Sequence, residues 1–156
     1  MADAGDFRAL LGRFPSGVAV VTVDSGGQRL GLTLGTLVGL SLDPPLVAIS
    51  IARQAALHEL LRGAGGFAVS LLGASQIELA QHFARGVPPI ALWHGIGKRG
   101  GARGPLLDGA LGWLECELRD EVAAGTHTLF VSAVERADHG SDAPALVRVR
   151  GGFASS

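Results

Sequence analysis

Val18-Ala19-Val20-Val21-Thr22-Val23 is a β-branched and nearly all apolar run, and the turn residues Asp24-Ser25-Gly26-Gly27 follow it directly. A second extended run continues over residues 29–40. β-branched residues favour strands, whereas Asp and Gly favour the tight turns that join them. The sequence therefore predicts a β-hairpin in the first quarter of the chain.

Further runs of strand composition follow along the chain, at residues 46–51, 67–72, 114–118, 126–134 and 145–149. Apolar residues at helical spacing predict short helices near residues 7–14 and 57–61, the first capped by Asp6. Ser75-Gln76-Ile77-Glu78 has the form of a capping box and predicts a helix through Phe83. Six or seven strands, two or three short helices and no regular βαβ alternation favour a mainly β fold, an antiparallel barrel with helical decorations.

Length and composition limit the kind of protein this is. The chain has 156 residues, is 47% hydrophobic and carries a formal net charge of −1. We expect one domain over residues 1–156, with its core in residues 6–150. A nucleic-acid or anionic-membrane binder would be basic, so neither partner is expected. The single Cys116 and the lack of a signal peptide or membrane span predict a cytoplasmic protein. The five histidines show no metal-ligand spacing, so no metal site is expected.

A long loop is predicted at residues 86–105, where periodicity disappears and six glycines and three prolines are interleaved with basic residues. Loops of this length in a small domain are usually functional lids or mobile segments. Trp93 in this loop has two possible roles, either stacking on a bound ring or anchoring the loop to the barrel.

Several fragments, taken in order, resemble the flavin reductase-like, FMN-binding split-barrel family. They are Phe7-Arg8, residues 11–22 (Leu-Gly-Arg-Phe-Pro-Ser-Gly-Val-Ala-Val-Val-Thr), Gly31-Leu32-Thr33, residues 41–47 (Ser-Leu-Asp-Pro-Pro-Leu-Val), His82-Phe83-Ala84, Pro105-Leu106-Leu107, Leu114-Glu115-Cys116, Gly125-Thr126-His127-Thr128 and Arg150-Gly151-Gly152-Phe153. The resemblance implies a homodimeric antiparallel split barrel of Greek-key type that holds FMN or FAD near the subunit interface. It also implies reduction of that flavin by NADH or NADPH, and in many relatives transfer of the reduced flavin to a partner monooxygenase.

The first flavin segment of the family usually has the sequence Gly-Met-Thr-Ala-Asn-Ser, and here it is Gly31-Leu32-Thr33-Leu34-Gly35-Thr36. The resemblance places Thr33, Leu34, Gly35 and Thr36 along the flavin ring edge and ribityl chain, where hydroxyls and backbone N–H groups can form hydrogen bonds. Gly35 replaces the family's Asn. Without the resemblance, the two threonines would be ordinary strand residues.

The second segment follows the strand at residues 46–51, and in relatives it holds the flavin phosphate. The resemblance assigns this role to Ile51, Ala52, Arg53, Ala56 and Leu57. Arg53 can form a charge-assisted clamp on phosphate, and the N–H groups that open the next helix can add an anion site. Ala55 and Ala56 lack the hydroxyls of relatives, which predicts a weakly held, dissociable flavin. The ordinary role of Arg53 would be a solvated surface residue.

Two further segments complete the candidate site. The resemblance places the corner Phe83-Ala84-Arg85 against the flavin, although Phe83 also fits a core position and Arg85 a cation at a helix C-terminus. His127 lies where the nicotinamide would stack on the flavin, and an imidazole can donate a hydrogen bond there without a permanent charge. Relatives commonly have Gly-Asp-His at this point, and Thr126 replaces the Asp.

Two alternatives to a reductase remain from the sequence. The replacements at Gly35, Ala55, Ala56 and Thr126 fit a degenerate split-barrel module used for binding or dimerisation, with weak or no reductase activity. A flavin oxidase of the pyridoxamine-phosphate oxidase type is the other. A serine hydrolase is excluded because there is no Gly-x-Ser-x-Gly motif, and Glu115 and Glu117 are expected on a solvated strand edge rather than as a catalytic pair.

Overall fold

The predicted hairpin begins the main sheet of the computed structural model, which describes residues 1–156. β2 (Ala19–Ser25) pairs antiparallel with β3 (Gln28–Leu34), from Ala19 opposite Leu34 to Ser25 opposite Gln28. Gly26 and Gly27 have φ values of 61° and 87°, the positive values that a two-residue hairpin turn needs. The extended run predicted over residues 29–40 is interrupted after Leu34, because β4 (Val38–Leu42) pairs with a different strand.

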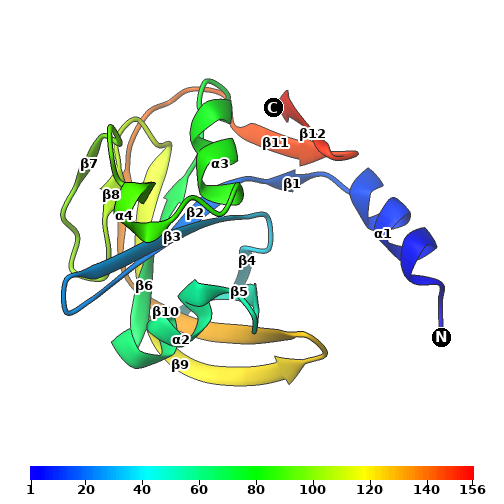
Figure 1. Cartoon of the computed structure of the whole chain (residues 1–156), viewed down its shortest axis with the longest axis horizontal. Coiled ribbons are helices and arrows are strands. Elements are labelled where there is room, and N and C mark those ends of the chain that lie inside the picture. Colours follow the sequence, from blue (N-terminus) through cyan, green and yellow to red (C-terminus); the bar gives the residue numbers. More distant parts are fainter.

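Seven antiparallel strands form the main sheet in the order β3-β2-β6-β9-β10-β5-β4, and the sheet curves around the interior of the molecule (Figure 1). The other members are β5 (Pro45–Ala52), β6 (Gly66–Leu71), β9 (Gly112–Ala124) and β10 (His127–His139). One cluster of 22 buried residues fills the interior, with Phe67 and Phe130 among its largest side chains. The predicted mainly β, antiparallel class is confirmed.

Small sheets and short helices surround this barrel. The small sheets contain β1 (Ser16–Gly17), β11 (Leu146–Val149) and β12 (Gly152–Ser155) in one, and β7 (Lys98–Arg99) and β8 (Leu106–Leu107) in the other. The helices are α1 (Ala4–Arg13), α2 (Ala56–Ala64), α3 (Ile77–Ala84) and α4 (Pro89–Leu92). None of these helices has the length and hydropathy that a bilayer crossing would require.

Three local predictions are wrong. Asp3, not Asp6, caps α1 by accepting from the Asp6 amide. The capping box at Ser75 does not form; Gln76 is the N-cap of α3, and its side-chain oxygen accepts from the Gly73 amide instead. Glu115 is buried rather than on a solvated edge, because β9 is a central strand and Arg103 covers it.

The segment predicted as a long loop, residues 86–105, contains α4 and β7 and is anchored to the barrel. Of the two roles considered for Trp93, the structure shows the anchoring one. Its Nε1 donates to the Arg29 carbonyl at 3.0 Å, and the centroid of its ring lies 5.3 Å from that of Phe83. Thr22 Oγ1 donates to the Pro105 carbonyl at 2.7 Å. These contacts hold both halves of the segment against β2 and β3.

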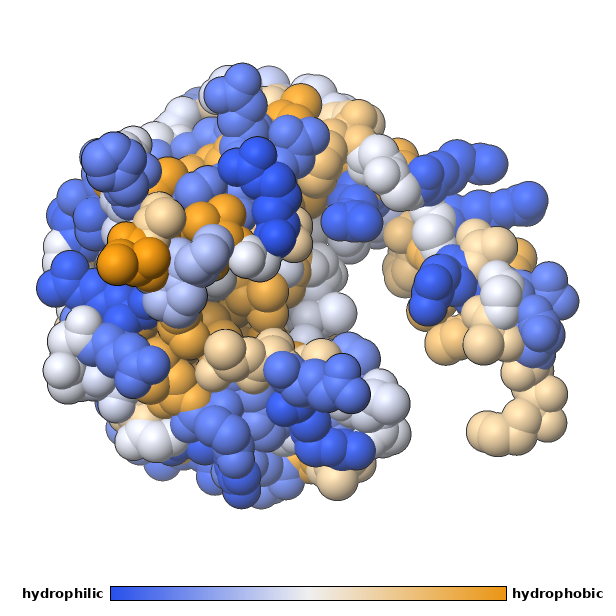
Figure 2. All heavy atoms as spheres, in the orientation of Figure 1, coloured by the Kyte–Doolittle hydropathy of each residue, from blue (hydrophilic) through white to orange (hydrophobic).

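α1 stands apart from the rest of the molecule, as Figures 1 and 2 show. It buries no residue. Four large apolar side chains, three on the helix and one at its C-cap, stay exposed: Phe7, Leu10, Leu11 and Phe14. A ten-residue helix is marginally stable alone in water, since most helical stability comes from packing an apolar face. The apolar residues of α1 therefore give this helix no stabilising packing within the chain.

Candidate functional site

The end of β5 and the start of β10 bring the predicted Arg53 and His127 together. These two strands pair with Ala52 opposite His127, and the Arg53 amide donates to the Thr126 carbonyl at 3.0 Å. The guanidinium of Arg53 donates to the carbonyls of His127, at 3.1 Å, and of Gly125. A guanidinium carries five N–H donors, so three remain free for an anion.

His127 is exposed, and its ring is held by its neighbour. Thr126 Oγ1 lies 2.9 Å from His127 Nδ1. Nε2 has no hydrogen-bond partner within the protein. Because the Thr126 hydroxyl can donate to Nδ1, Nε2 can carry the proton and donate to a ligand.

The N-terminus of α2 lies beside this corner. Its N-cap, Ala55, offers no side-chain cap, so the first amides of the helix have no side-chain partner. Uncapped helix N-termini carry partial positive charge and free N–H groups, which bind phosphate well. Arg53 and these amides together make up the corner, where an anion-binding role remains an expectation from the sequence.

An apolar pocket of about 340 Å³ opens next to the same helix end. Four residues from two of the predicted segments line it together: Ala56, Leu57, Phe83 and Ala84. The remaining lining is Ala55, together with residues of β3 and of the segment around α4, which include Leu30, Leu32 and Pro88. Pockets that are mainly apolar with a few polar groups at the rim are typical of ring-shaped ligands.

The hydroxyls of the first predicted segment form hydrogen bonds with the protein's own backbone. Thr33 Oγ1 donates to the Ala80 carbonyl at 2.6 Å, which ties β3 to α3. Thr36 Oγ1 lies 3.1 Å from the Ser50 carbonyl and 3.2 Å from the Ser50 amide. Leu34 and Ile51 are buried in the core. This segment therefore has mostly backbone groups left for a ligand.

Gly35 lies close to β1. A Cβ at this position would lie 2.5 Å from Ser16 Oγ, the end of a side chain that can rotate away, and 3.4 Å from the Gly17 carbonyl oxygen, which is within ordinary contact range. A side chain at position 35 would therefore require Ser16 to change its rotamer.

The residues of the third predicted segment, Phe83-Ala84-Arg85, do not all lie at the pocket. Phe83 is 2% exposed, and its ring packs against the backbone of Gly31. Arg85 lies away from the corner, with its guanidinium 3.3 Å from His82 Nδ1. Phe83 and Ala84 line the apolar pocket, whereas Arg85 does not.

His58 supports the corner and was missed by the sequence analysis. It is 4% exposed, with Nε2 2.7 Å from Thr128 Oγ1 and Nδ1 2.9 Å from Glu59 Oε2. The hydrogen bond from His58, together with Arg62, holds the pKa of Glu59 below its usual value. His58 thereby links α2 to β10 one residue after His127. No sequence signal pairs residues 70 positions apart.

Other reactive groups do not form a second centre. Burial raises the pKa of the Cys116 thiol to about 12, so at neutral pH it is an inert core side chain. The structure gathers no group of three or more His, Cys, Asp or Glu side chains that could hold a metal ion.

Comparison with known proteins gives consistent matches. The model of the flavin reductase like domain family matches residues 11–156. The reductase component of 4-hydroxyphenylacetate 3-monooxygenase from Thermus thermophilus is 38% identical over 148 residues, covering 94% of this chain and 93% of the relative. The NADH-dependent FMN reductase AsuE2 of Streptomyces nodosus subsp. asukaensis is 38% identical over 157 residues, covering 95% and 82%.

Solved structures agree with these relatives. BorF, the flavin reductase component of a bacterial two-component tryptophan halogenase, superposes with a TM-score of 0.91 at 35% identity, covering 98% of both chains. The NADH:FAD oxidoreductase SgcE6 of Streptomyces globisporus C-1027, in complex with NAD and FAD fragments, gives 0.91 at 32% identity, covering 99% and 94%. The chain belongs to the flavin reductase-like domain family and has its split-barrel fold.

Proposed function

We propose that this protein is a flavin reductase that uses a reduced nicotinamide, NADH or NADPH, to reduce FMN or FAD, and that it supplies the reduced flavin to a partner monooxygenase. The observation that carries the proposal is the corner formed by Arg53, the α2 N-terminus and His127 beside an apolar pocket. Relatives named NADH:FMN oxidoreductase and NADH-dependent FAD reductase support the activity. Relatives named as monooxygenase reductase components support the partner.

Different residues of the corner and the pocket bind different parts of the flavin in this proposal. Arg53 and the first amides of α2 hold the flavin phosphate, and the pocket lined by Leu57 and Phe83 receives the apolar ring system. The bound flavin supplies the redox chemistry, accepting at N5 the hydride that leaves C4 of the nicotinamide. His127 Nε2 donates to the nicotinamide carboxamide or to the flavin, which aligns the two rings for transfer.

The backbone groups along Thr33, Leu34, Gly35 and Thr36, with Ile51 and Ala52 on β5, complete the flavin contacts in this proposal. The polar contacts of the phosphate come from one arginine and backbone amides, without a hydroxyl at Ala55 or Ala56. Such a site favours a flavin that binds and leaves, which is what delivery to a second enzyme requires. Arg85 is left out of the site because it lies with His82 instead.

The protein acts as a homodimer in this proposal. A second copy is the occupant that best fits the exposed face of α1, because β4 presents a matching apolar surface at Val38, Leu40 and Leu42. Figure 2 shows α1 projecting from the main body, with an open gap between the two. Large apolar surfaces left uncovered on a small protein mark association sites.

The activity is tested by mixing the purified protein with FMN and NADH under air and following NADH oxidation. Continuous oxidation that depends on FMN is expected. A flavin oxidase would bind flavin without consuming NADH, and a degenerate module would do neither. Substitution of NADPH for NADH in the same assay identifies the preferred nicotinamide.

The role of Arg53 is tested with Arg53→Ala, and Arg85→Ala serves as the matched arginine control. We expect FMN binding to weaken by about 1.5–3 kcal/mol, the range for a hydrogen bond to a charged group. Riboflavin has no phosphate, so its affinity should change little. Equal losses for FMN and riboflavin, measured by fluorescence titration, would show that Arg53 acts by shaping the Gly125–His127 turn instead.

A further inference from the structure

His58 lies in the first turn of α2, with its side chain buried against β10. It is 4% exposed, and the centroid of its ring lies 5.2 Å from that of Phe130. Burying a polar ring is costly unless its nitrogen atoms form hydrogen bonds. Both nitrogens do so, because Nε2 lies 2.7 Å from Thr128 Oγ1 and Nδ1 lies 2.9 Å from Glu59 Oε2. The ring is therefore fixed from both sides.

The hydrogen bond between His58 and Thr128 is kept whatever the charge of the ring. A carboxylate only accepts, so Nδ1 donates to Glu59. In the neutral ring Nε2 then accepts from the Thr128 hydroxyl, and in the charged ring it donates to that hydroxyl. Thr128 is 6% exposed, and its Oγ1 has no other hydrogen-bond partner in the protein. α2 is thus joined to β10 by a buried hydrogen bond.

A second link joins α2 to β9 at the surface. Arg62 donates to both carboxylate oxygens of Glu59, at 3.1 and 3.2 Å, and its Nε lies 2.8 Å from Glu121 Oε1. Exposed ion pairs of this kind contribute little to stability. We therefore expect the buried hydrogen bond from His58 to Thr128, and not this surface link, to set the position of the first turn of α2.

The first turn of α2 carries donors for an anion. The amides of Ala56 and Leu57 donate to no group of the protein, whereas the His58 amide donates to the Ala55 carbonyl at 3.0 Å. Free amides at a helix N-terminus suit phosphate oxygens. The side chain that is bonded to Thr128 therefore belongs to the residue directly after the two free donors.

Arg53 is fixed to the same strand as His58. Its guanidinium donates to the carbonyls of His127 and Gly125 where β10 begins, and Thr128 is the next residue of that strand. The guanidinium and the helix amides are thus tied to successive residues of β10. Hydrogen bonds weaken steeply with distance and angle, so donors that share one phosphate need fixed relative positions.

We infer that His58 is a positioning residue for the flavin phosphate. By holding the first turn of α2 on Thr128, it keeps the Ala56 and Leu57 amides beside Arg53, so that one phosphate group accepts from all of them. The inference rests on the proposed function, which supplies the ligand. It adds that His58 sets the preference for FMN over riboflavin, which has no phosphate.

Two variants of His58 separate its bond to Thr128 from its bond to Glu59. The amide of Gln can lie where Nε2 lies and so reach Thr128, whereas the shorter Asn reaches only Glu59. Flavin fluorescence measures the affinities for FMN and riboflavin without NADH. We expect His58→Asn to lose about tenfold in affinity for FMN and less than about twofold for riboflavin. His58→Gln should stay within about threefold for both flavins.

Substitutions of Thr128 test the same bond from its other end. Thr128→Val keeps the shape of the side chain and removes the hydroxyl, so the ratio of FMN affinity to riboflavin affinity should fall as in His58→Asn. Thr128→Ser should keep the ratio. Combining His58→Asn with Thr128→Val should cost no more than the larger single loss, since both remove one bond. Ser70→Ala, which removes another buried hydroxyl of the main sheet, is the matched control and should leave the ratio unchanged.

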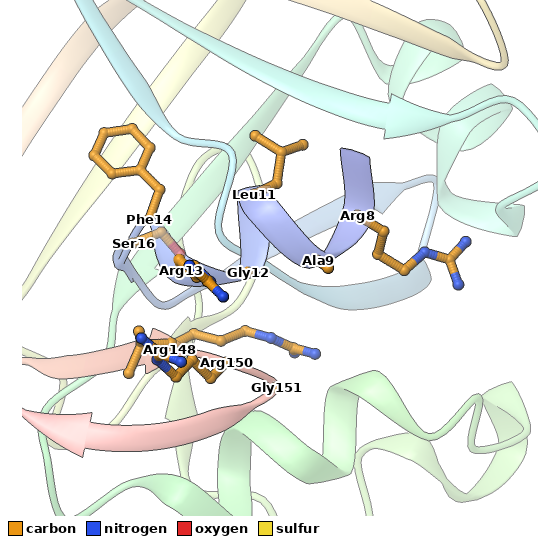
Figure 3. Close-up of a pocket in the computed structure, with 11 residues that line it drawn as sticks. Arg8, Ala9, Leu11, Gly12, Arg13, Phe14, Ser16, Arg148, Arg150 and Gly151 are labelled. Carbon is orange, nitrogen blue, oxygen red and sulfur yellow. The ribbon is translucent and has the colours of Figure 1, made fainter. Parts of the chain in front are cut away.

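The largest cluster of arginines on the protein needs its own control. A groove of about 660 Å³ lies between α1 and the β11–β12 hairpin, and Arg8, Arg13, Arg148 and Arg150 line it (Figure 3). It shares no lining residue with the pocket beside α2. Arg148→Gln should therefore leave the affinity ratio unchanged. A fall as large as that in His58→Asn would assign the phosphate to the groove and overturn the inference.

Other results would overturn it as well. Equal losses for FMN and riboflavin in His58→Asn, or a loss in His58→Gln as large as in His58→Asn, would mean that His58 only stabilises the fold. An affinity ratio that Thr128→Val leaves unchanged, or an unmodified protein that does not prefer FMN to riboflavin, would contradict the inference directly.

Failure of the inference and failure of the proposed function give different results. A protein whose FMN preference depends on His58 but that does not oxidise NADH would keep the inference and lose the proposed function. A protein that oxidises NADH with FMN, and whose FMN preference is the same in every variant, would lose the inference and keep the proposed function.

Discussion

At the scale of single residues, the orientation of His127 in the candidate site depends on the Thr126 hydroxyl, at a position where the family resemblance leads us to expect the carboxylate of an Asp. Thr126 Oγ1 lies 2.9 Å from His127 Nδ1 and orients the exposed ring. A hydroxyl can donate to a neutral imidazole, whereas a carboxylate would accept from it and favour the charged form. With Thr at position 126, the hydroxyl can still orient His127, and when it donates to Nδ1 the proton of the neutral ring lies on Nε2.

Thr126→Val should lower NADH oxidation without a matching loss of flavin affinity. Valine keeps the shape of threonine and removes the hydrogen bond to Nδ1. A neutral hydrogen bond contributes about 0.5–1.5 kcal/mol, so kcat should fall about two- to tenfold. Steady-state kinetics and FMN titration measure the two quantities. Thr126→Ser should retain most of the rate, and an equal fall in that variant would contradict the orienting role.

Gly35→Asn should lower the free energy of unfolding by about 1 kcal/mol at most. The new Cβ would meet Ser16 Oγ at 2.5 Å, but rotation of the Ser16 side chain to another rotamer relieves this contact at low cost. Urea denaturation measures the change. Combining it with Ser16→Ala, which removes Oγ, should recover the loss. A much larger loss that Ser16→Ala does not recover would mean that the backbone at Gly35, and not Ser16 Oγ, is the cause.

At the scale of elements, Arg103 fastens the segment that carries β7 to the sheet. Its guanidinium donates to both carboxylate oxygens of Glu135 on β10, at 3.0 and 2.7 Å. Its backbone amide donates to the buried Glu115 on β9 at 3.2 Å, and its carbonyl accepts from the Asp24 amide on β2. One residue thus connects three strands of the main sheet to a segment that has little regular structure.

The stabilising effect of Arg103 should depend on pH. The hydrogen bond from Arg103 lowers the pKa of Glu135 from its usual value of 4.5, so the carboxylate binds a proton less readily in the folded state. A lowered folded pKa gives stability that is present above pH 4.5 and is lost as the pH falls through the folded pKa.

Arg103→Gln should therefore lower the melting temperature at neutral pH, and the gap to the unmodified protein should narrow below pH 4.5. Thermal denaturation across this range measures the effect. Arg119→Gln, another arginine on β9, is the control and should show a smaller gap at neutral pH. A gap for Arg103→Gln that stays constant with pH would mean that packing of the side chain, rather than its pairing with Glu135, stabilises the segment.

At the scale of the whole molecule, α1 is the helix whose apolar face is left exposed by a single chain. The helix is joined to the barrel through β1 and the hydrogen bond from the Arg150 amide to the Gly12 carbonyl, yet its apolar face stays exposed. The proposed dimer would cover this face and the exposed residues of β4 together.

Leu10→Glu with Phe14→Glu should weaken the proposed dimer. Two charges on an apolar contact face are costly to bury, so the variant should sediment as a monomer where the unmodified protein sediments as a dimer. Ile90→Glu, an exposed apolar residue on α4, is the control and should remain dimeric. An unmodified protein that sediments as a monomer at all concentrations would contradict the proposed dimer.

Much of the fold follows from local patterns. The β2–β3 hairpin, the strand character of β5, β6, β10 and β11, and the apolar spacing of α2 and α3 depend on neighbouring residues, so the sequence predicts them. Helix caps were less predictable. Asp6 and Ser75 have the right residue types, but α1 begins three residues earlier, where Asp3 accepts from the Asp6 amide, and α3 begins after Gln76 without any side-chain cap.

The sequence alone determined the strand and turn composition, the family resemblance and the segments that hold candidate site residues, because these depend on residues close together in the chain. The tertiary structure alone decided which of them meet. It placed Arg53 on the His127 turn and separated Arg85 from both. It also buried Glu115, and it paired the hydroxyls of Thr33 and Thr36 with backbone groups of the protein. Contacts between residues many positions apart depend on strand order and register, and no local pattern encodes that order.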